Sequence, residues 1–194
     1  DVVILKYGAL QEAAFAEPGG EALRKFIDEC PNQLYAALTF QGGAAWRKRL
    51  HDTIGDQGPV SALIDRRSDA ELSKLMTNLG GHDLPSLLKA FAEAAKHDRP
   101  TCFIAYTIKG CGLPLAGHKD NHAGLMTTAQ MDTFRAEMGI REGHEWDRFE
   151  GLSLPAKEIE RFLKNVPFNR AGTRRLQADA IPVPERLAAE VPAV

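Results

Sequence analysis

The chain has 194 residues, of which 44% are hydrophobic and 26% are charged, with 24 Lys and Arg against 26 Asp and Glu. This balance is typical of a soluble globular protein with one domain, or with one large and one rudimentary domain. It excludes a wholly disordered, collagen-like or coiled-coil chain. The net charge of -2 offers no general attraction to nucleic acid or to an anionic membrane. Small molecules or proteins are therefore the expected partners.

Cysteine content and hydropathy indicate the compartment. Cys30, Cys102 and Cys111 show no C-x-x-C spacing, which argues against a disulfide scaffold and against a structural zinc site. No apolar run approaches the roughly 18–20 residues that span a bilayer. The opening residues 1–5 lack the basic start of a signal peptide. We expect a soluble protein in a reducing, cytoplasmic compartment.

Two short runs predict buried β-strands. Residues 2–7 and 101–108 are continuous in apolar or β-favouring residues and are bounded by turn residues. Strands of this kind suit a parallel α/β sheet that is covered on both faces. Because two strands are too few for an independently stable sheet, we expect the chain to be part of a longer protein.

Apolar residues at helical spacing predict helices between and after these strands. The stripes begin at Leu23, Leu72, Leu87 and Ile159. Ser68 with Glu71 and Thr127 with Gln130 form capping boxes, and Asp83 marks a third helix start. Four of the 11 prolines fall within residues 167–194. This proline-rich end predicts an extended inter-domain linker.

The densest group of reactive side chains follows the second strand, in residues 109–124. Four glycines and one proline predict a loop there. Ligands of α/β sheets bind outside the carboxyl ends of the strands, and this loop leaves such an end with two lysines and two histidines. A functional loop is therefore favoured over a surface loop with solvated charges.

Two other interpretations of this loop are weaker. His118, Asp120 and His122 could converge on a divalent cation, but residues four apart share a face only on a helix, so the spacing is not specific. We therefore assign no metal ligand. Cys111 lies near Lys109 without a visible His-Asn partner pattern, and we expect it to be a spectator.

Ordered motifs carry a resemblance to a known family. Gly80-Gly81-His82-Asp83 opens a helix, Arg99-Pro100-Thr101 enters a strand, and the run from Tyr106 to Gly112 leads to His122-Ala123-Gly124. In this order they resemble the thiamine-diphosphate enzymes of the transketolase superfamily. The lysine of the second-strand run and the helix predicted after the loop are most similar to the homodimeric pyruvate dehydrogenase decarboxylating component, whereas transketolases carry an isoleucine-glycine there.

The similarity covers about residues 1–150 and implies an α/β fold with parallel strands and several helices. This part would be the second half of the diphosphate-binding (PP) domain, and residues 151–194 would form a helix and an extended C-terminal linker. The implied oxidoreductase is a homodimer that decarboxylates pyruvate or a related 2-oxo acid and passes the acyl group to a lipoyl-bearing acyltransferase component. A transketolase-like ketol transferase acting on sugar phosphates and a non-catalytic interaction module are the alternatives.

The resemblance also implies roles for single residues. Lys109, Gly110 and Gly112 would bind thiamine diphosphate, the glycines by letting the backbone approach closely. His122 would be the catalytic histidine of a mobile loop. Positioned cations and proton donors suit this chemistry because decarboxylation of a 2-oxo acid develops charge. His82, in contrast, is expected to be structural.

Other parts of the site are expected outside this chain. The motif that holds Mg²⁺ and the diphosphate would lie upstream of Asp1, and the glutamate that activates the cofactor would lie downstream of Val194. The chain alone is therefore expected to be inactive.

Overall fold

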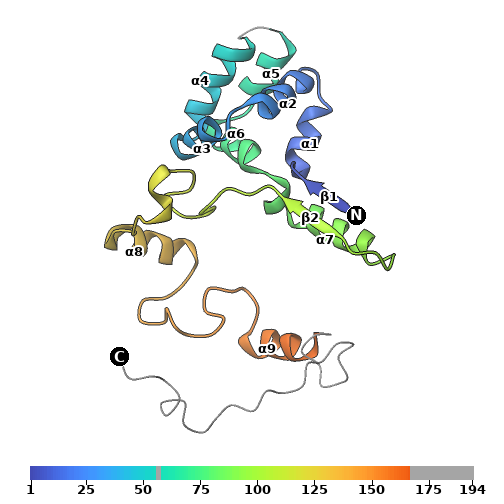
Figure 1. Cartoon of the computed structure of the whole chain (residues 1–194). Coiled ribbons are helices and arrows are strands. Elements are labelled where there is room, and N and C mark those ends of the chain that lie inside the picture. Colours follow the sequence, from blue (N-terminus) through green and yellow to red (C-terminus); the bar gives the residue numbers. More distant parts are fainter. Residues whose placement is uncertain (56–57, 167–194) are drawn as a thin grey trace, which may run out of the picture. The chain divides into compact units, whose positions relative to one another are not determined.

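The computed structural model describes residues 1–55 and 58–166 and shows a mixed α/β fold (Figure 1). In chain order its elements are β1 (Val2–Leu5), α1 (Ala9–Phe15), α2 (Gly20–Glu29), α3 (Asn32–Gln41), α4 (Gly43–Ile54), α5 (Pro59–Asp65), α6 (Asp69–Thr77), the 3-10 turn η1 (Gly80–His82), α7 (Leu84–Ala94), β2 (Cys102–Ala105), the 3-10 turn η2 (Lys119–His122), α8 (Thr128–Glu137) and α9 (Ala156–Asn165). The chain divides into two compact units, Asp1–Met131 and Asp132–Val194.

The sheet of the first unit has two parallel strands within the described residues. β1 pairs with β2 in a register that sets Val2 opposite Cys102 and Leu5 opposite Ala105. Parallel strands need a crossover connection, which here is the helical segment from α1 to α7. The α/β class and the parallel strands predicted from the sequence are confirmed.

Both strands end earlier than the sequence predicts, because the residues after them bond to a glycine turn. The Lys6 carbonyl accepts the N–H of Gly80 at 3.0 Å. The Tyr106 carbonyl accepts the N–H of Gly81 at 2.9 Å. A Cβ at Gly80 would lie 2.5 Å from the Leu5 carbonyl oxygen, and one at Gly81 would lie 2.6 Å from the Tyr106 oxygen. Glycine is required for this approach, so η1 ties the ends of both strands together.

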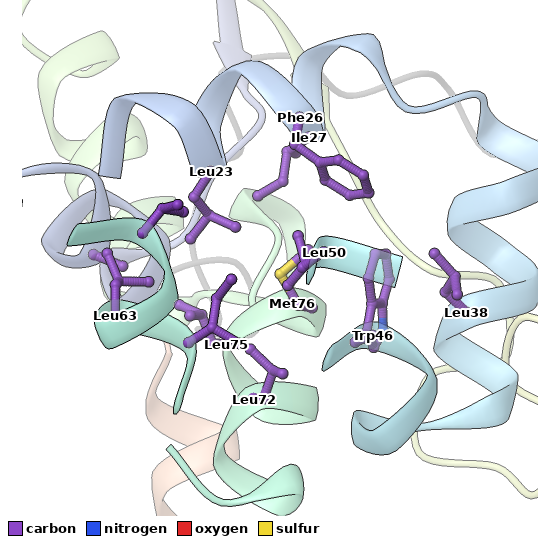
Figure 2. Packing of buried hydrophobic residues seen from close by; sticks show 13 residues of the cluster. Leu23, Phe26, Ile27, Leu38, Trp46, Leu50, Leu63, Leu72, Leu75 and Met76 are labelled. Atoms are coloured by element: carbon purple, nitrogen blue, oxygen red, sulfur yellow. The ribbon is translucent and has the colours of Figure 1, made fainter. Parts of the chain in front are cut away.

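The core lies among helices α1 to α6 and is built around Trp46, whose side chain is fully buried (Figure 2). Phe26 and Tyr35 stand edge-on to the indole ring, with ring centroids 6.5 Å and 4.8 Å away. Aliphatic side chains and one methionine fill the space around them, including Leu23, Ile27, Leu38, Leu50, Leu63, Leu72, Leu75 and Met76. The stripes predicted for α2 and α6 therefore face this core.

Three helices start where the sequence predicts them. The Ser68 hydroxyl accepts the N–H of Glu71 at 3.3 Å, and the Glu71 carboxylate accepts the N–H of Ser68 at 2.8 Å, which completes the capping box of α6. Thr127 and Gln130 exchange the equivalent pair at the start of α8. Asp83 caps α7 by accepting a main-chain N–H at 3.1 Å.

One face of the sheet packs against α7, where Phe103 of β2 meets Phe91 with ring centroids 4.7 Å apart. On the opposite face Val2, Ile4 and Ile104 are 65%, 62% and 44% exposed. The sequence predicts strands covered on both faces, and the structure differs because no described element packs on this second face. The exposed face is apolar.

The second unit is described up to residue 166, and ion pairs are prominent in it. Arg135 donates a hydrogen bond to Glu145 at 3.0 Å. Arg141 donates two hydrogen bonds to the Glu150 carboxylate, at 2.6 Å and 3.1 Å. The predicted apolar stripe of α9 forms, but none of the residues of this helix is buried. The predicted linker at residues 167–194 lies outside the described residues.

Candidate functional site

The loop that follows β2 begins at the carboxyl end of the parallel sheet (Figure 1). Nε2 of His82 accepts the main-chain N–H of Ile108 at 2.7 Å, which fixes the chain where it enters the loop. The neighbouring Asp83 is buried, and hydrogen bonds from Ser86 lower the pKa of its carboxyl group. His82 thus holds the entrance of the loop through its ring, and a purely structural role for it stays a prediction.

Lys109 and His122, the two polar residues predicted to act at this site, lie in direct contact. Lys109 Nζ is 2.8 Å from His122 Nδ1. A lysine ammonium group can only donate a hydrogen bond, so Nδ1 accepts it and the ring proton of a neutral imidazole resides on Nε2. Both residues are exposed. The pair therefore presents a positive charge and an N–H donor side by side.

Asn121 and Gly110 close the loop on itself. Asn121 Nδ2 donates to the Lys109 carbonyl oxygen at 2.6 Å. Gly110 has a φ of 71°, and a Cβ at this position would overlap the Asn121 side-chain amide. The close approach at Gly110 is thus made to Asn121. Gly112 also has a positive φ, 83°, and faces open space. Cofactor binding by the two glycines stays a prediction.

A cavity of about 560 Å³ opens beside this loop and falls within the size range of small-ligand sites. The basic residues in its lining are Lys6, Lys109, His118, Lys119 and His122. Asp28 is the acidic residue in the lining. With more cationic than anionic groups around it, the cavity suits an anionic ligand.

The Lys6–Asp28 ion pair on the wall of this cavity is not apparent from the sequence. Asp28 accepts hydrogen bonds from Lys6 Nζ and from the Tyr7 hydroxyl. Burial works to raise the pKa of Asp28, but these two hydrogen bonds together with the positive charges of Lys6 and Arg24 outweigh it and leave the pKa below its usual range. One signal could have identified Lys6: it is the first charged residue after the apolar run of residues 2–5, just as Lys109 is the first charged residue after the second apolar run.

The far end of the loop rests on α3. The ring centroid of His118 lies 4.5 Å from that of Phe40. His118 Nδ1 also accepts the N–H of Asp120 at 3.1 Å and so caps η2. Gly117 has a φ of 77°, and a Cβ there would overlap the Ala36 carbonyl oxygen. The sequence analysis counts His118 among the cationic groups of a functional loop and assigns it no metal, but it does not predict the contact with α3.

Among residues 1–55 and 58–166, no three or more His, Cys, Asp or Glu side chains are arranged to hold a metal ion. The three cysteines are free thiols, and Cys102 and Cys111 are exposed. Within the same residues, no helix has both the length and the apolar character that crossing a bilayer requires.

Comparison with known proteins gives two curated relatives. The chain is 27% identical to the pyruvate dehydrogenase E1 component of Cupriavidus necator, over 95% of this chain and 21% of that protein. It is 32% identical to the pyruvate dehydrogenase E1 component of Corynebacterium glutamicum, over 57% of this chain and 11% of that protein. No protein-family model matches the chain. No solved structure matches it either.

The resemblance predicted from the motifs is thereby confirmed: the chain is similar to pyruvate dehydrogenase E1 components. It spans about a fifth, or less, of the length of the curated relatives that it matches. The similarity therefore concerns one part of a much longer enzyme.

Proposed function

We propose that this chain is part of a thiamine-diphosphate-dependent pyruvate dehydrogenase. About residues 1–150 belong to its diphosphate-binding domain, and residues 151–194 form a helix and a linker. The complete enzyme is a cytoplasmic homodimer that decarboxylates pyruvate or a related 2-oxo acid and transfers the acyl group to the lipoyl group of an acyltransferase. The observation that carries the proposal is the contact of Lys109 with His122 at the carboxyl end of two parallel strands.

The residues around the cavity fit the anionic parts of cofactor and substrate. Lys109, Lys119 and His122 supply cationic or N–H donor groups in its lining. Diphosphate and carboxylate oxygens accept hydrogen bonds from such groups. A ligand set for Mg²⁺ is not found among the described residues. We propose that the metal ligands lie in other parts of the longer enzyme.

Thiamine diphosphate, when bound, supplies the electron sink for decarboxylation of a 2-oxo acid. The chain contributes the electrostatics of the site. Lys109 holds a fixed positive charge in the cavity and sets the tautomer of His122 through Nδ1. His122 then holds a proton at Nε2, where it can be donated to a ligand oxygen. Asn121 keeps the backbone of the loop closed, so that the pair stays together.

The test is steady-state kinetics of the complete enzyme with pyruvate, Mg²⁺ and thiamine diphosphate. We expect His122→Ala to lower kcat by about 100-fold, the scale of a positioned acid or base, with a smaller change in cofactor affinity. Lys109→Met should lower kcat and also weaken cofactor affinity. The charge of Lys109 stabilises the bound ligand both in the ground state and in the transition state.

Matched variants control for loss of an imidazole or an ammonium group elsewhere. His97 pairs with Asp1 at the amino end of the strands, and Lys48 pairs with Asp52 on α4. His97→Ala and Lys48→Met should leave kcat within about twofold, since surface substitutions away from a site change little.

Two results would contradict the proposal. Turnover of sugar phosphates in place of any 2-oxo acid would identify a ketol transferase. Absence of cofactor-dependent turnover of both substrate classes would identify an interaction module.

A further inference from the structure

We propose that His118 is a positioning residue, which holds His122 at the cavity through a tilted contact of its ring with the Phe40 ring of α3, at an interplanar angle of 54°. The effect on turnover rests on the proposed function, whereas the effect on the loop does not. This tilted ring contact, called the stack below, joins two residues that are far apart along the chain, with ring centroids separated by 4.5 Å.

The turn η2 connects the stacked histidine to the acting one. His118 is the N-cap of η2, and His122 is its last residue. The His118 carbonyl accepts the N–H of Asn121 at 3.1 Å, and its ring accepts the N–H of Asp120. These hydrogen bonds link His118 to the turn that ends at His122, so we expect a displacement of the His118 ring to displace His122 as well.

Helix α3 gives the stack a rigid base. Its Leu38 is buried in the core, and Tyr35 packs edge-on against Trp46 with ring centroids 4.8 Å apart. Phe40 lies in the last turn of the same helix. The helix that carries Phe40 is therefore anchored in the core, while 45% of Phe40 itself remains exposed.

A second contact beside the stack shows that the loop approaches α3 closely. Gly117 packs on the Ala36 carbonyl so tightly that a Cβ would overlap it. The hydrogen bond from Asn121 to Lys109, in contrast, joins the loop only to itself. Without the contact to α3, the closed loop could rotate as a unit away from the cavity wall formed by α2 and α3.

Two substitutions at the same position separate stacking from capping. His118→Phe keeps a ring on Phe40 but loses the acceptor for η2. His118→Asn keeps a capping acceptor but loses the ring. If the stack positions His122, His118→Asn lowers kcat of the complete enzyme about tenfold with KM nearly unchanged, and His118→Phe stays within about threefold of the parent, because ring stacking survives.

Variants of Phe40 complete a double-mutant cycle. Phe40→Ala should lower kcat as much as His118→Asn does, and the double variant should lose no more than either single variant. Phe40→Tyr, which keeps an aromatic ring at this position, should retain the parent kcat. Phe40→Leu keeps apolar cover over the helix without a ring and serves if Phe40→Ala destabilises the enzyme.

Hydrogen exchange of the complete enzyme without cofactor gives a readout independent of catalysis. Amides of residues 115–124 should exchange faster in Phe40→Ala and His118→Asn than in the parent and Phe40→Tyr, while α4 and α6 stay protected.

Unchanged loop exchange and unchanged kcat in Phe40→Ala and His118→Asn would overturn the proposal. Additive losses in the double variant would overturn it too. If the parent enzyme turns over no 2-oxo acid, the proposed function fails, and the exchange data still decide the role of His118.

Discussion

The Asn121 side-chain amide donates to the Lys109 carbonyl oxygen at 2.6 Å and so joins the two ends of the candidate loop across 12 residues. The same short stretch carries the contact between Lys109 Nζ and His122. The hydrogen bond of Asn121 therefore closes the chain at the point where the two acting side chains meet.

Removing this hydrogen bond should loosen the pair without unfolding the core. We expect Asn121→Ala to lower kcat of the complete enzyme by about fivefold, consistent with roughly 1 kcal/mol for one hydrogen bond. Hydrogen exchange of residues 109–112 should accelerate in parallel. Asn165→Ala removes the same kind of bond, to the Arg161 carbonyl in α9, and is the matched control. Equal effects of the two variants on kcat would refute the role of Asn121.

The cap of α7 predicts a pH dependence of stability. The pKa of Asp83 is lowered in the folded chain by its hydrogen bonds from Ser86, so its ionised form stabilises the fold above the usual carboxyl pKa of 3.8. This stabilisation is lost as the pH falls below 3.8 and through the lowered pKa of the folded state.

Asp83→Ala should remove this dependence. We expect it to cost about 1 kcal/mol of unfolding free energy at neutral pH and to flatten the fall in stability below the usual carboxyl pKa. Urea unfolding at a series of pH values measures both quantities. Asp98→Asn, at an exposed position, is the control. The same steep acid dependence in Asp83→Ala as in the parent would show that the cap does not contribute.

The chain alone should bind thiamine diphosphate weakly. Its cavity offers cations, but the described residues hold no group of metal ligands. Calorimetry of the 194-residue chain with cofactor and Mg²⁺ should give a dissociation constant well above about 1 μM, which corresponds to less than about 8 kcal/mol of binding free energy. Binding at or below that concentration would mean that the chain carries a complete site.

The uncovered face of the sheet predicts self-association. Ile4 and Ile104 stand next to each other across the two strands and are 62% and 44% exposed. Apolar faces of this kind drive association. Sedimentation of the 194-residue chain should show mass increasing with concentration, and Ile4→Lys should reduce the increase. Leu10→Lys, at an exposed apolar position of α1, is the control. A single monomer mass over a wide concentration range would contradict the prediction.

The features that the sequence predicts well depend on neighbours along the chain. The capping box of Ser68 with Glu71 involves residues three apart, and the stripe beginning at Leu72 has the period of a helix. The parallel class of the sheet also follows from local pattern, since two apolar runs flank a long helical segment. Each of these signals can be recognised without knowing which distant segments meet.

The features that the sequence does not predict join segments distant along the chain. Lys6, which follows β1, pairs with Asp28 of α2. The ring of Phe40 in α3 contacts His118 in the loop after β2. No periodicity marks such pairs, because they depend on how α2 and α3 pack over the strand ends. The early ends of both strands have the same origin, namely the distant turn at Gly80.

The register of the sheet also orders the events of folding. Val2 meets Cys102 about a hundred residues later, so the entropy of closing this long loop opposes strand pairing. The contacts around Trp46 join helices close to one another in the chain and can form sooner. We therefore expect the helical core to assemble first and the strands, with the loop that follows β2, to dock last. We expect the reverse order in the native state: the candidate site should open in local fluctuations that leave the core intact.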